Sequence, residues 1–459
     1  MPVPPIILTI AETVRAARGR ALLVGGCVRD ELLGLDPKDY DLEVFGVPAD
    51  EVEGILLHCG QARRVGRSFP VWKVWPFEGS ESEAVDVALP RREVKMGLNH
   101  TDFEVILDPN MTFADAALRR DFTINAIGLD PLTGEVLDPH SGREDIRTKT
   151  LRHVSHHFAE DPLRVLRGAQ FCARFNLTAH PDTVALCRTL TPEHLSTERL
   201  WDEWVKLILK GAKPSLGLHF LRGTGWLAHF PELAALVDVP QDAGHHPEGP
   251  VHRHVEHCMD AFAARRTGDD YEDLVVGFAV LCHDMGKATT TTRDERGIHA
   301  YGHEEAGEAP TRAFLGRLTN QTDFIDDVVA LVTTHMIPTH LYKEATRGET
   351  VKQMNRSVRR LARRVRLDRL ARVVLADKSG RPPKPQIAPE AEWLLDRAAN
   401  LSVAKEGPVP ILMGRHLIEL GLQPSILFKT ILTATLEKQL DGDITTLDEA
   451  VAYAKTFIP

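Results

Sequence analysis

The sequence lacks any long hydrophobic run. No apolar stretch approaches the roughly 20 residues that a membrane-spanning helix needs, and the start, MPVPPIILTIAETVRAARGR, has neither a basic segment nor a small-residue cleavage site. Cysteine is sparse as well, because six residues are scattered through 459 without a CxxC pair. This spacing argues against a disulfide framework and against a zinc ribbon. We therefore expect a cytoplasmic protein with reduced thiols and no membrane partner.

An excess of positive charge is missing too. The 55 lysines and arginines face 65 aspartates and glutamates, for a net charge of −10, which argues against a general nucleic-acid coat protein. Residues 351–374, VKQMNRSVRRLARRVRLDRLARVV, differ from this average with nine basic residues, one acidic residue and an amphipathic pattern. We predict an amphipathic helix there, whose charged face is either solvated or a contact for phosphate groups.

The chain is too long for one ordinary domain. Residues 20–140 mix short β-like runs with Gly, Pro and Asp turns, whereas later segments repeat apolar residues at three-and-four spacing. We predict an α+β fold in four parts: a head at 1–147, a mainly α-helical neck at 148–238, a third domain at 239–380 and a helical tail at 381–459.

The first chemical pattern is LLVGGCVRDELLG, which predicts a strand, a turn at Gly25 and Gly26, and a helix starting near Val28. Backbone amides at such a turn suit a phosphate chain, and Arg29 adds a fixed cation. Glycine pairs at strand-to-helix turns are common and usually structural, so the neighbouring residues decide between the two interpretations.

Those neighbours are the carboxylates of DPKDYDLEVFG. If residues 40–45 form a strand, Asp39 and Asp41 point the same way with carboxylates roughly 6 to 7 Å apart, which is costly without a cation between them. Asp86, in EAVDVALPR, alternates with apolar neighbours and is predicted to be an inward-facing charge that needs a partner. Such carboxylates beside a phosphate cradle suit nucleotidyl transfer with Mg²⁺. For an isolated DxD, an acidic turn before an edge strand is the alternative.

LVGGCVRDELLG followed by KDYDLEVFG resembles the DNA polymerase β-like nucleotidyltransferases, specifically the class II CCA-adding enzymes, with bacterial poly(A) polymerases as close relatives. ALRRDFTINAIGLDP, DPHSGREDI, LRHVSHHFAEDPLRVLRGAQFCARF and STERLWDE continue the match in family order to about residue 210. The resemblance implies a polymerase β-like head and template-independent addition of CCA to the 3′ end of tRNA from CTP and ATP, with Mg²⁺. Addition of A only or CC only, and poly(A) synthesis, stay open.

The resemblance also implies the site residues. Asp39 and Asp41 would bind the metal ions, with Asp86 as the third catalytic carboxylate. The implied nucleotide site consists of Gly25, Gly26, Arg29, Arg120, Asp121, Asn125, Asp161, Arg164 and Arg167. Asp161 and Arg164 of EDPLR would read the base edge, because a carboxylate accepts from the amino group of cytosine or adenine while a guanidinium donates to ring acceptors.

In the family a flexible loop occupies the place of residues 91–119, and its presence favours full CCA addition or A addition. That loop is polar and contains glycine in its first half.

A second pattern combines His254 in VHRHVEHCMD, His283 and Asp284 in LCHDMGK, and Asp377 in LADKSG. A lone His–Asp pair is more often packing and capping, but this order resembles the HD superfamily of metal-dependent phosphohydrolases. Imidazoles with carboxylates suit Ni²⁺, Co²⁺ or Mn²⁺. The resemblance implies an HD domain that hydrolyses 2′,3′-cyclic phosphates or phosphomonoesters. The rivals are an HD phosphohydrolase with an RNA-binding head, and a purely RNA-binding protein.

Further side chains near this pattern have weaker signals. Lys287 is predicted to contact phosphate or to cap a helix C-terminus. Four histidines could supply a second metal ion or bind phosphate, although we favour ordinary surface histidines for each: His299, His303, His335 and His340. The segment at 410–450 is similar to the tail that follows an HD domain in these enzymes, and we assign it to RNA or interdomain contacts. No oligomeric state is predicted.

Overall fold

The computed structural model describes residues 3–65, 70–95 and 103–458. Two compact units make up the chain: Met1–Leu207 with Leu216–His229, and Ile208–Ser215 with Phe230–Pro459. The α+β fold is confirmed, since the main sheet lies in the first unit and the second unit is mainly helical. The finer division into four parts stays a prediction. Within the described ranges, no helix is both long and apolar enough to cross a membrane.

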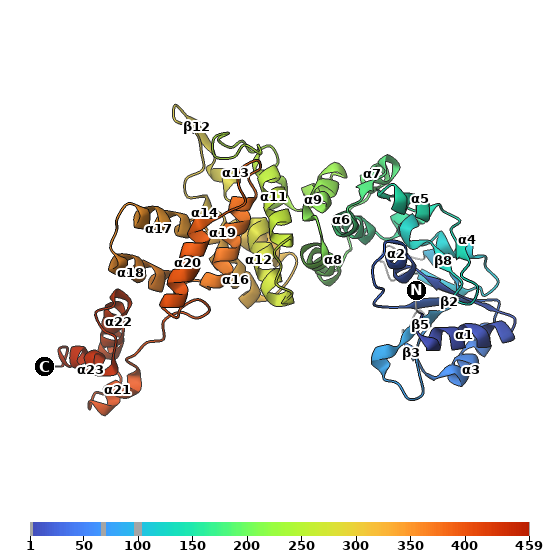
Figure 1. Cartoon of the computed structure of the whole chain (residues 1–459), viewed down its shortest axis with the longest axis horizontal. Coiled ribbons are helices and arrows are strands. Elements are labelled where there is room, and N and C mark those ends of the chain that lie inside the picture. Colours follow the sequence, from blue (N-terminus) through green and yellow to red (C-terminus); the bar gives the residue numbers. More distant parts are fainter. Residues whose placement is uncertain (1–2, 66–69, 96–102, 459) are drawn as a thin grey trace. The chain divides into compact units, whose positions relative to one another are not determined.

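A seven-stranded sheet with helices on both faces makes up most of the strand structure of the first unit (Figure 1). Its strands, in spatial order, are β3 (Gln61–Val65), β4 (Val71–Trp75), β5 (Val85–Ala88), β2 (Asp41–Phe45), β1 (Arg20–Val24), β8 (Gly128–Leu129) and β9 (Val136–Leu137). Strand β2 runs antiparallel to β1 and parallel to β5. The β-like runs of the sequence are therefore strands of one sheet.

The alternation of side chains gives the two faces of this sheet different roles. Leu23 and Leu42 belong to the core that packs against α1 (Pro5–Ala16) and α3 (Ala49–Cys59). Phe45 belongs to a second core on the other face, with α4 (Phe113–Ala117). Since side chains of a strand alternate, Asp41 and Glu43 lie on the same face as Phe45. The carboxylates of β2 are thus directed away from the larger core.

The remaining elements of the first unit are short strands and helices. They are α2 (Gly26–Leu32), β6 (Arg91–Lys95), β7 (Phe103–Leu107), α5 (Gly142–Arg147), β10 (Thr150–Leu151), α6 (Leu163–Phe175), β11 (Thr178–Ala179) and α7 (Pro181–Cys187), with α8 (Thr197–Lys210) and α9 (Pro214–Gly223) at the division between the units. Helix α6 ends at Asn176, whose φ of 55° is the left-handed cap that asparagine tolerates.

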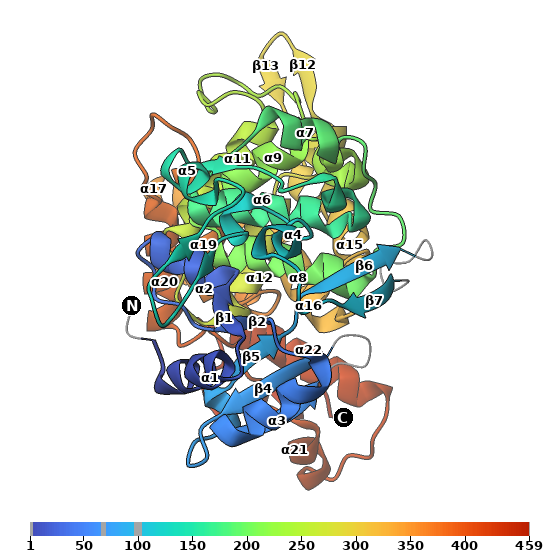
Figure 2. The same cartoon turned by 90° about the vertical axis from the view of Figure 1, so that its right-hand side faces the viewer.

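The second unit is a helical assembly in which α11, α12 and α19 pack against one another. Its elements are α10 (Pro231–Ala234), α11 (Val251–Ala263), α12 (Asp270–Cys282), α13 (Lys287–Thr290), β12 (Thr292–Asp294), β13 (Gly297–His299), α14 (His303–Ala306), α15 (Glu308–Gly316), α16 (Thr322–Thr334), α17 (Ile337–Thr346), α18 (Val351–Ala362), α19 (Leu367–Ser379), α20 (Pro389–Asn400), α21 (Gly414–Glu419), α22 (Ile426–Asp441) and α23 (Leu447–Lys455). The β12–β13 hairpin projects beyond the helices of its unit (Figure 2).

The basic segment at 351–374 forms two helices, α18 and the start of α19, instead of the single predicted helix. Several of its cations face protein carboxylates. Arg360 lies 2.7 Å from Glu437 and 2.9 Å from Asp441 of α22, and Arg369 lies 2.7 Å from Glu272. Ion pairs to α12 and to α22 therefore engage these two arginines, whereas Arg363 and Arg364 of the same segment are exposed, as the predicted solvated face requires.

Candidate functional site

Two of the predicted catalytic carboxylates are brought together by the sheet. Asp41 opens β2 and is the direct register partner of Asp86 on the parallel strand β5. The backbone N–H of Asp86 donates to the carbonyl of Tyr40 over 3.0 Å. The strand starts at Asp41, one residue later than predicted, and Asp39 lies in the bend that precedes it.

Asp86 is not the inward-facing charge that its sequence neighbours predict. The neighbouring valines of β5 face the core, whereas the Asp86 side chain is 38% exposed and lies 3.0 Å from Lys73 Nζ. Asp41 is exposed toward the cavity, but the protein around its carboxyl displaces water and raises its pKa, and the charges of Asp86 and Asp39 add to this, although Arg120 opposes it. A divalent cation would relieve this repulsion, and oxygen donors suit Mg²⁺.

A cavity of about 440 Å³ lies beside Asp41 in the first unit. Its lining contains all nine residues of the predicted nucleotide site: Gly25, Gly26, Arg29, Arg120, Asp121, Asn125, Asp161, Arg164 and Arg167. Arg119, Leu163 and Arg199 complete it and were not predicted. The cavity is therefore rich in guanidinium groups, as an anionic ligand requires.

Gly25 is needed where the chain turns from β1 into α2. Its φ of 75° lies in the left-handed region, and a Cβ at this position would come within 3.1 Å of Arg120 Nη1 and 3.7 Å of Asp41 Oδ2. The helix begins at Gly26, two residues before the predicted start at Val28. Glycine at this turn thus keeps space beside Asp41 open.

Arg29 has partners within the protein. Its Nη1 donates to Asn125 Oδ1 over 2.7 Å and its Nε donates to Asp30 Oδ1 over 2.8 Å. Burial lowers the pKa of this guanidinium, although Asp30 opposes the shift. Arg29 therefore links α2 to the segment around Asn125, and its predicted contact with the triphosphate stays a prediction.

The buried Asp121 pairs with the half-buried Arg167 in the same cavity. Asp121 Oδ2 accepts from Arg167 Nε over 3.0 Å, and its Oδ1 accepts from Asn125 Nδ2 over 2.8 Å. Burial alone would raise the pKa of Asp121, but Arg167 and Asn125 outweigh it and lower the pKa. Asp121, Asn125 and Arg167, three of the nine residues predicted to contact the nucleotide, thus hold one another in place.

Glu43 is a buried charge that the sequence did not single out. Its residue is 1% exposed, and its carboxylate lies 3.1 Å from Arg119 and 3.2 Å from Arg120. Since Asp41 and Glu43 share one face of β2, this carboxylate orients two cavity arginines next to the predicted metal ligands. The only sequence signal was a charged residue inside an otherwise apolar strand.

The predicted base-reading pair is also fixed by protein groups. Arg164 donates from Nη1 to the carbonyl of His157 over 2.6 Å and from Nη2 to that of Arg119 over 2.7 Å. Asp161 Oδ2 accepts from Arg199 Nη2 over 2.7 Å. Arg199 lies in the quoted STERLWDE segment, but no local pattern connects it to a residue 38 positions earlier.

The predicted flexible loop at 91–119 falls partly outside the described residues, namely at 96–102. On either side of that gap, β6 and β7 pair antiparallel.

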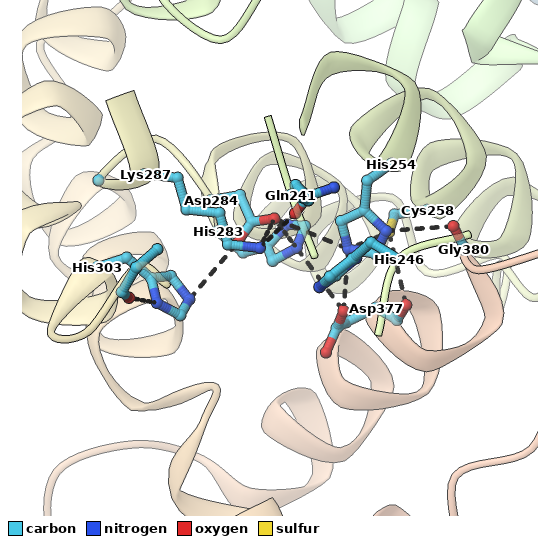
Figure 3. Close-up of polar contacts among 12 residues, drawn as sticks. Gln241, His246, His254, Cys258, His283, Asp284, Lys287, His303, Asp377 and Gly380 are labelled. Atoms are coloured by element: carbon cyan, nitrogen blue, oxygen red, sulfur yellow. Dashed lines mark hydrogen bonds and ion pairs between the residues drawn. The ribbon is translucent and has the colours of Figure 1, made fainter. Parts of the chain in front are cut away.

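The four predicted HD residues meet in the second unit (Figure 3). His254 lies on α11, His283 and Asp284 follow α12, and Asp377 lies near the end of α19. His254 Nε2 is 3.0 Å from Asp377 Oδ1 and 3.7 Å from Asp284 Oδ2, while His283 Nε2 is 3.4 Å from Asp284 Oδ2. All four are buried.

His303 and His335 are not surface histidines, so that preferred interpretation was wrong for them. They are 7% and 2% exposed, and their Nε2 atoms lie 3.2 Å apart. His303 Nε2 also lies 3.4 Å from Asp284 Oδ1, so Asp284 faces histidines with both oxygens. His340 is exposed, as expected, and His299 is half-buried beside Asp294.

Three more groups around His254 were missed by the sequence argument. Cys258 lies one turn further along α11, with Sγ 3.4 Å from His254 Nε2, and the i, i+4 spacing is the signal that could have found it. Glu248 lies 2.8 Å from His254 Nδ1 and 2.9 Å from His246 Nδ1. Despite burial, these histidines lower the pKa of Glu248 to about 2.

The donor atoms of this cluster fit a transition-metal ion. His283 Nε2 is buried and makes no hydrogen bond to any group within residues 3–65, 70–95 and 103–458. Burial lowers the pKa of His283, and burial with the neighbouring His283 and His303 lowers that of His335 to about 3. Both imidazoles are therefore neutral at pH 7 and offer lone pairs. Asp284 and Asp377 supply charge. Despite burial, the surrounding imidazoles and Lys287 hold the pKa of Asp284 well below its usual range, and Arg381 with His254 does the same for Asp377.

A cavity of about 380 Å³ opens onto this cluster. Its lining includes four cations: Lys287, Lys343, Lys378 and Arg381. Lys287 Nζ lies 2.7 Å from Asp284 Oδ2 and 2.8 Å from Gln241 Oε1, so it pairs with a predicted metal ligand and does not cap the preceding helix. Cations beside a set of metal donors suit a phosphate ester.

Known proteins match most of the chain. Residues 21–152 match the poly A polymerase head domain, and residues 176–236 match a probable RNA and SrmB binding site of polymerase A. The Multifunctional CCA protein of Xanthomonas campestris is 39% identical over 78% of this chain and 85% of the relative, and that of Laribacter hongkongensis is 37% identical over 85% and 94%.

Solved structures share the fold. The Bacillus stearothermophilus CCA-adding enzyme in complex with CTP has a TM-score of 0.64 at 23% identity, covering 99% of this chain and 98% of that one. The Thermotoga maritima CCA-adding enzyme complexed with tRNA has a TM-score of 0.59 at 19% identity, covering 100% and 97%.

Proposed function

Because the chain belongs to the family of CCA-adding nucleotidyltransferases, we propose that it adds CCA to the 3′ end of tRNA from CTP and ATP. The tRNA 3′-hydroxyl attacks the α-phosphate, the bond to the pyrophosphate breaks and pyrophosphate leaves. The observation that carries this proposal is the cavity that combines Asp41 with all nine predicted nucleotide contacts. A tRNA substrate also supports the predicted cytoplasmic location.

The chain's own groups have distinct tasks in this proposal. Asp39 and Asp41, with Asp86 as the third carboxylate, would hold Mg²⁺, which would supply a clamp for the attacking and leaving oxygens. Arg120, oriented by Glu43, faces the same space and balances the charge of the phosphates. Asp161 and Arg164 offer an acceptor and donors to the base edge, which cytosine and adenine match and uracil and guanine do not.

Extension of a tRNA that ends before CCA tests the proposal. With CTP alone we expect two added residues, and with CTP and ATP together three. If no C is incorporated, the proposal of CCA addition is overturned. An enzyme that adds A only to a tRNA already ending in CC would be an A-adding enzyme, and one that makes long A tracts would be a poly(A) polymerase. If extension stops after two C residues although both CTP and ATP are supplied, the protein is a CC-adding enzyme.

We also propose that the second unit hydrolyses phosphate esters. The buried histidine–aspartate cluster at the base of a cation-lined cavity supports this second function. His254, His283, Asp284 and Asp377 would hold Ni²⁺, Co²⁺ or Mn²⁺, which supplies an activated water, and His303 with His335 would extend the donor set. Hydrolysis of bis-p-nitrophenyl phosphate with each metal tests it. Activity that persists in His283→Ala would contradict the assignment.

A further inference from the structure

We propose that Cys258 binds the metal ion of the second unit through its sulfur. The proposal rests on the metal-dependent hydrolysis proposed above and adds a ligand to that site. The histidine–aspartate pattern of the sequence contains no cysteine, so the ion would have a softer donor than that pattern provides.

Cys258 is one of four residues whose donor atoms lie close enough to share one ion. Its Sγ lies within 4.8 Å of the donor atoms of the other three, which lie equally close to one another: His254, His283 and Asp377. An ion bound tetrahedrally through bonds of about 2.0 to 2.3 Å would hold its ligand atoms roughly 3.3 to 3.8 Å apart. The four atoms would therefore need to move by only about 1 Å or less to bind one ion.

The packing of two helices places this sulfur beside the predicted ligands (Figure 3). Cys258 lies one turn after His254 on α11, with Sγ 3.4 Å from His254 Nε2. Gly380, at the end of α19, lets that helix approach closely, because a Cβ there would overlap Cys258 Sγ and come within 2.8 Å of its backbone nitrogen. Sγ also lies 3.7 Å from the carbonyl oxygen of Asp377. The sulfur is thus confined between the helices that carry two of the predicted ligands.

His283 indicates independently that this place accepts a ligand. It is 1% exposed, and its Nε2 makes no hydrogen bond to any other group among the described residues. Burial of a polar nitrogen without such a bond is costly. A metal ion would satisfy this nitrogen, and the distances above would let the same ion reach the sulfur.

The surroundings of Cys258 differ from those of the other five cysteines. All six are buried, but within the part of the chain that the structure describes only Cys258 belongs to a group of metal donors. Cys282 gives a close comparison, since it directly precedes His283 and is 0% exposed, yet it is no member of such a group. A buried thiol usually acts as a small core residue, and Cys282 fits that description.

A sulfur ligand would change which ions the site prefers. Thiolate is a soft donor that favours Co²⁺ and Zn²⁺ over Mn²⁺ and Mg²⁺. On binding, the S–H bond is replaced by a bond to the ion and the proton passes to solvent, so no oxidant or reductant is needed. The neighbouring donors Asp284, His303 and His335 include no sulfur, so an ion bound by them alone would not share this preference.

Absorption spectroscopy of the full-length protein with Co²⁺ tests the proposal. The parent protein carries Asp41→Asn, so that the first unit contributes less bound Co²⁺. A bond between sulfur and Co²⁺ gives a charge-transfer band in the near ultraviolet, which nitrogen and oxygen ligands alone do not give. At equal amounts of bound Co²⁺, we expect this band in the parent protein and in Cys282→Ser, the matched control, and its loss in Cys258→Ser.

Equilibrium dialysis measures the change in metal preference. Cys258→Ser should bind Co²⁺ about tenfold or more weakly than the parent protein, whereas its affinity for Mn²⁺ should fall less than about threefold. Equal losses of affinity for both ions would overturn the sulfur ligand, because a merely structural thiol would affect both alike.

The spectrum of the parent protein decides the proposal even if Cys258→Ser does not fold, since bound Co²⁺ without the band overturns it. A band that persists in Cys258→Ser also overturns it, because another thiol then supplies the sulfur. The proposed hydrolysis is judged apart from this. If the band is present but bis-p-nitrophenyl phosphate is not cleaved, the ligand is confirmed and the hydrolytic function is wrong, and cleavage without the band means the reverse. If the parent protein binds no Co²⁺, both proposals are wrong.

Discussion

The cavities of the two units are similar in volume, about 440 and 380 Å³, but their donors come from different elements. In the first, carboxylates of neighbouring strands face guanidinium groups, and Glu43 holds Arg119 and Arg120 in place. In the second, imidazoles and carboxylates converge from the helices and their ends. Strand pairing fixes oxygen donors at regular spacing, which suits Mg²⁺, whereas helix ends gather nitrogen donors that suit softer ions. A substitution that abolishes the activity of one site should therefore leave the activity of the other site intact.

The largest expected effect comes from removing one metal ligand in each cavity. Asp41→Asn should lower nucleotide addition to tRNA at least about a thousandfold, because several kcal/mol of charge stabilisation are lost. It should leave ester hydrolysis within about twofold, while Asp284→Asn should have the reverse pattern. Asp36→Asn, which changes an exposed carboxylate close to Asp41 in sequence, is the control. Loss of both activities in either variant would contradict two independent sites.

A smaller effect is expected from the buried carboxylate that orients the first cavity. Glu43→Gln leaves Arg119 and Arg120 without their shared counter-charge, which should lower the stability of the sheet by roughly 3 kcal/mol. Hydrogen exchange of the β1 and β2 amides measures this locally, and Glu51→Gln on the exposed side of α3 is the control. Unchanged protection in Glu43→Gln would mean that the arginines find other partners.

The stability that Glu43 contributes through Arg119 and Arg120 should depend on pH in a definite direction. Burial would raise the pKa of Glu43, but Arg120 and Arg119 outweigh it and hold the pKa below 4.5. A depressed pKa contributes stability that is complete above the unfolded value and is lost as the pH falls through the folded value. Protection of β1 and β2 should therefore fall below about pH 4.5 in the wild type, and Glu43→Gln should lack this step.

The approach of Asp41 to Asp86 could be anticipated from the sequence, since alternation and a shared metal ion require carboxylates on neighbouring strands. The strand-to-helix turn itself indicated Gly25, Gly26 and Arg29, whereas the other six cavity residues followed only from the resemblance of their motifs. The alternation of side chains along β5 did not indicate which of its two faces packs against the core. The Asp86 side chain was therefore expected on the core face, but it lies on the opposite face. The strand was expected to begin at residue 40, one residue too early, because the start of a strand depends on pairing with a partner strand, which local sequence does not specify.

Residues whose partners are distant in sequence were hardest to predict. Glu43 finds its arginines 76 and 77 positions away, and a charge in an apolar strand has no feature that identifies them. His303 and His335 lie 32 positions apart and carry no spacing signal. Their role appears only when α14 and the end of α16 are brought to Asp284 by tertiary packing.

Metal removal should sharpen the contrast between oxygen and nitrogen donors. After treatment with EDTA and dialysis, both activities should be lost. Mg²⁺ alone should restore nucleotide addition, yet leave ester hydrolysis about tenfold or more below its level with Ni²⁺, Co²⁺ or Mn²⁺, since imidazole donors favour these ions. Recovery of both activities to the same extent with Mg²⁺ alone would contradict the assignment of different metal preferences.

The smallest effect is expected outside both cavities, at the ion pairs between α18 and α22. Arg360→Gln removes contacts to Glu437 and Asp441 that are largely solvated, so the stability of the second unit should fall by less than about 1 kcal/mol. Since these carboxylates already neutralise Arg360, the dependence of tRNA binding on salt concentration should not change. If the slope of log K against log salt instead decreases in magnitude by about one, Arg360 contacts a phosphate, and the basic segment would then belong to the tRNA-binding surface.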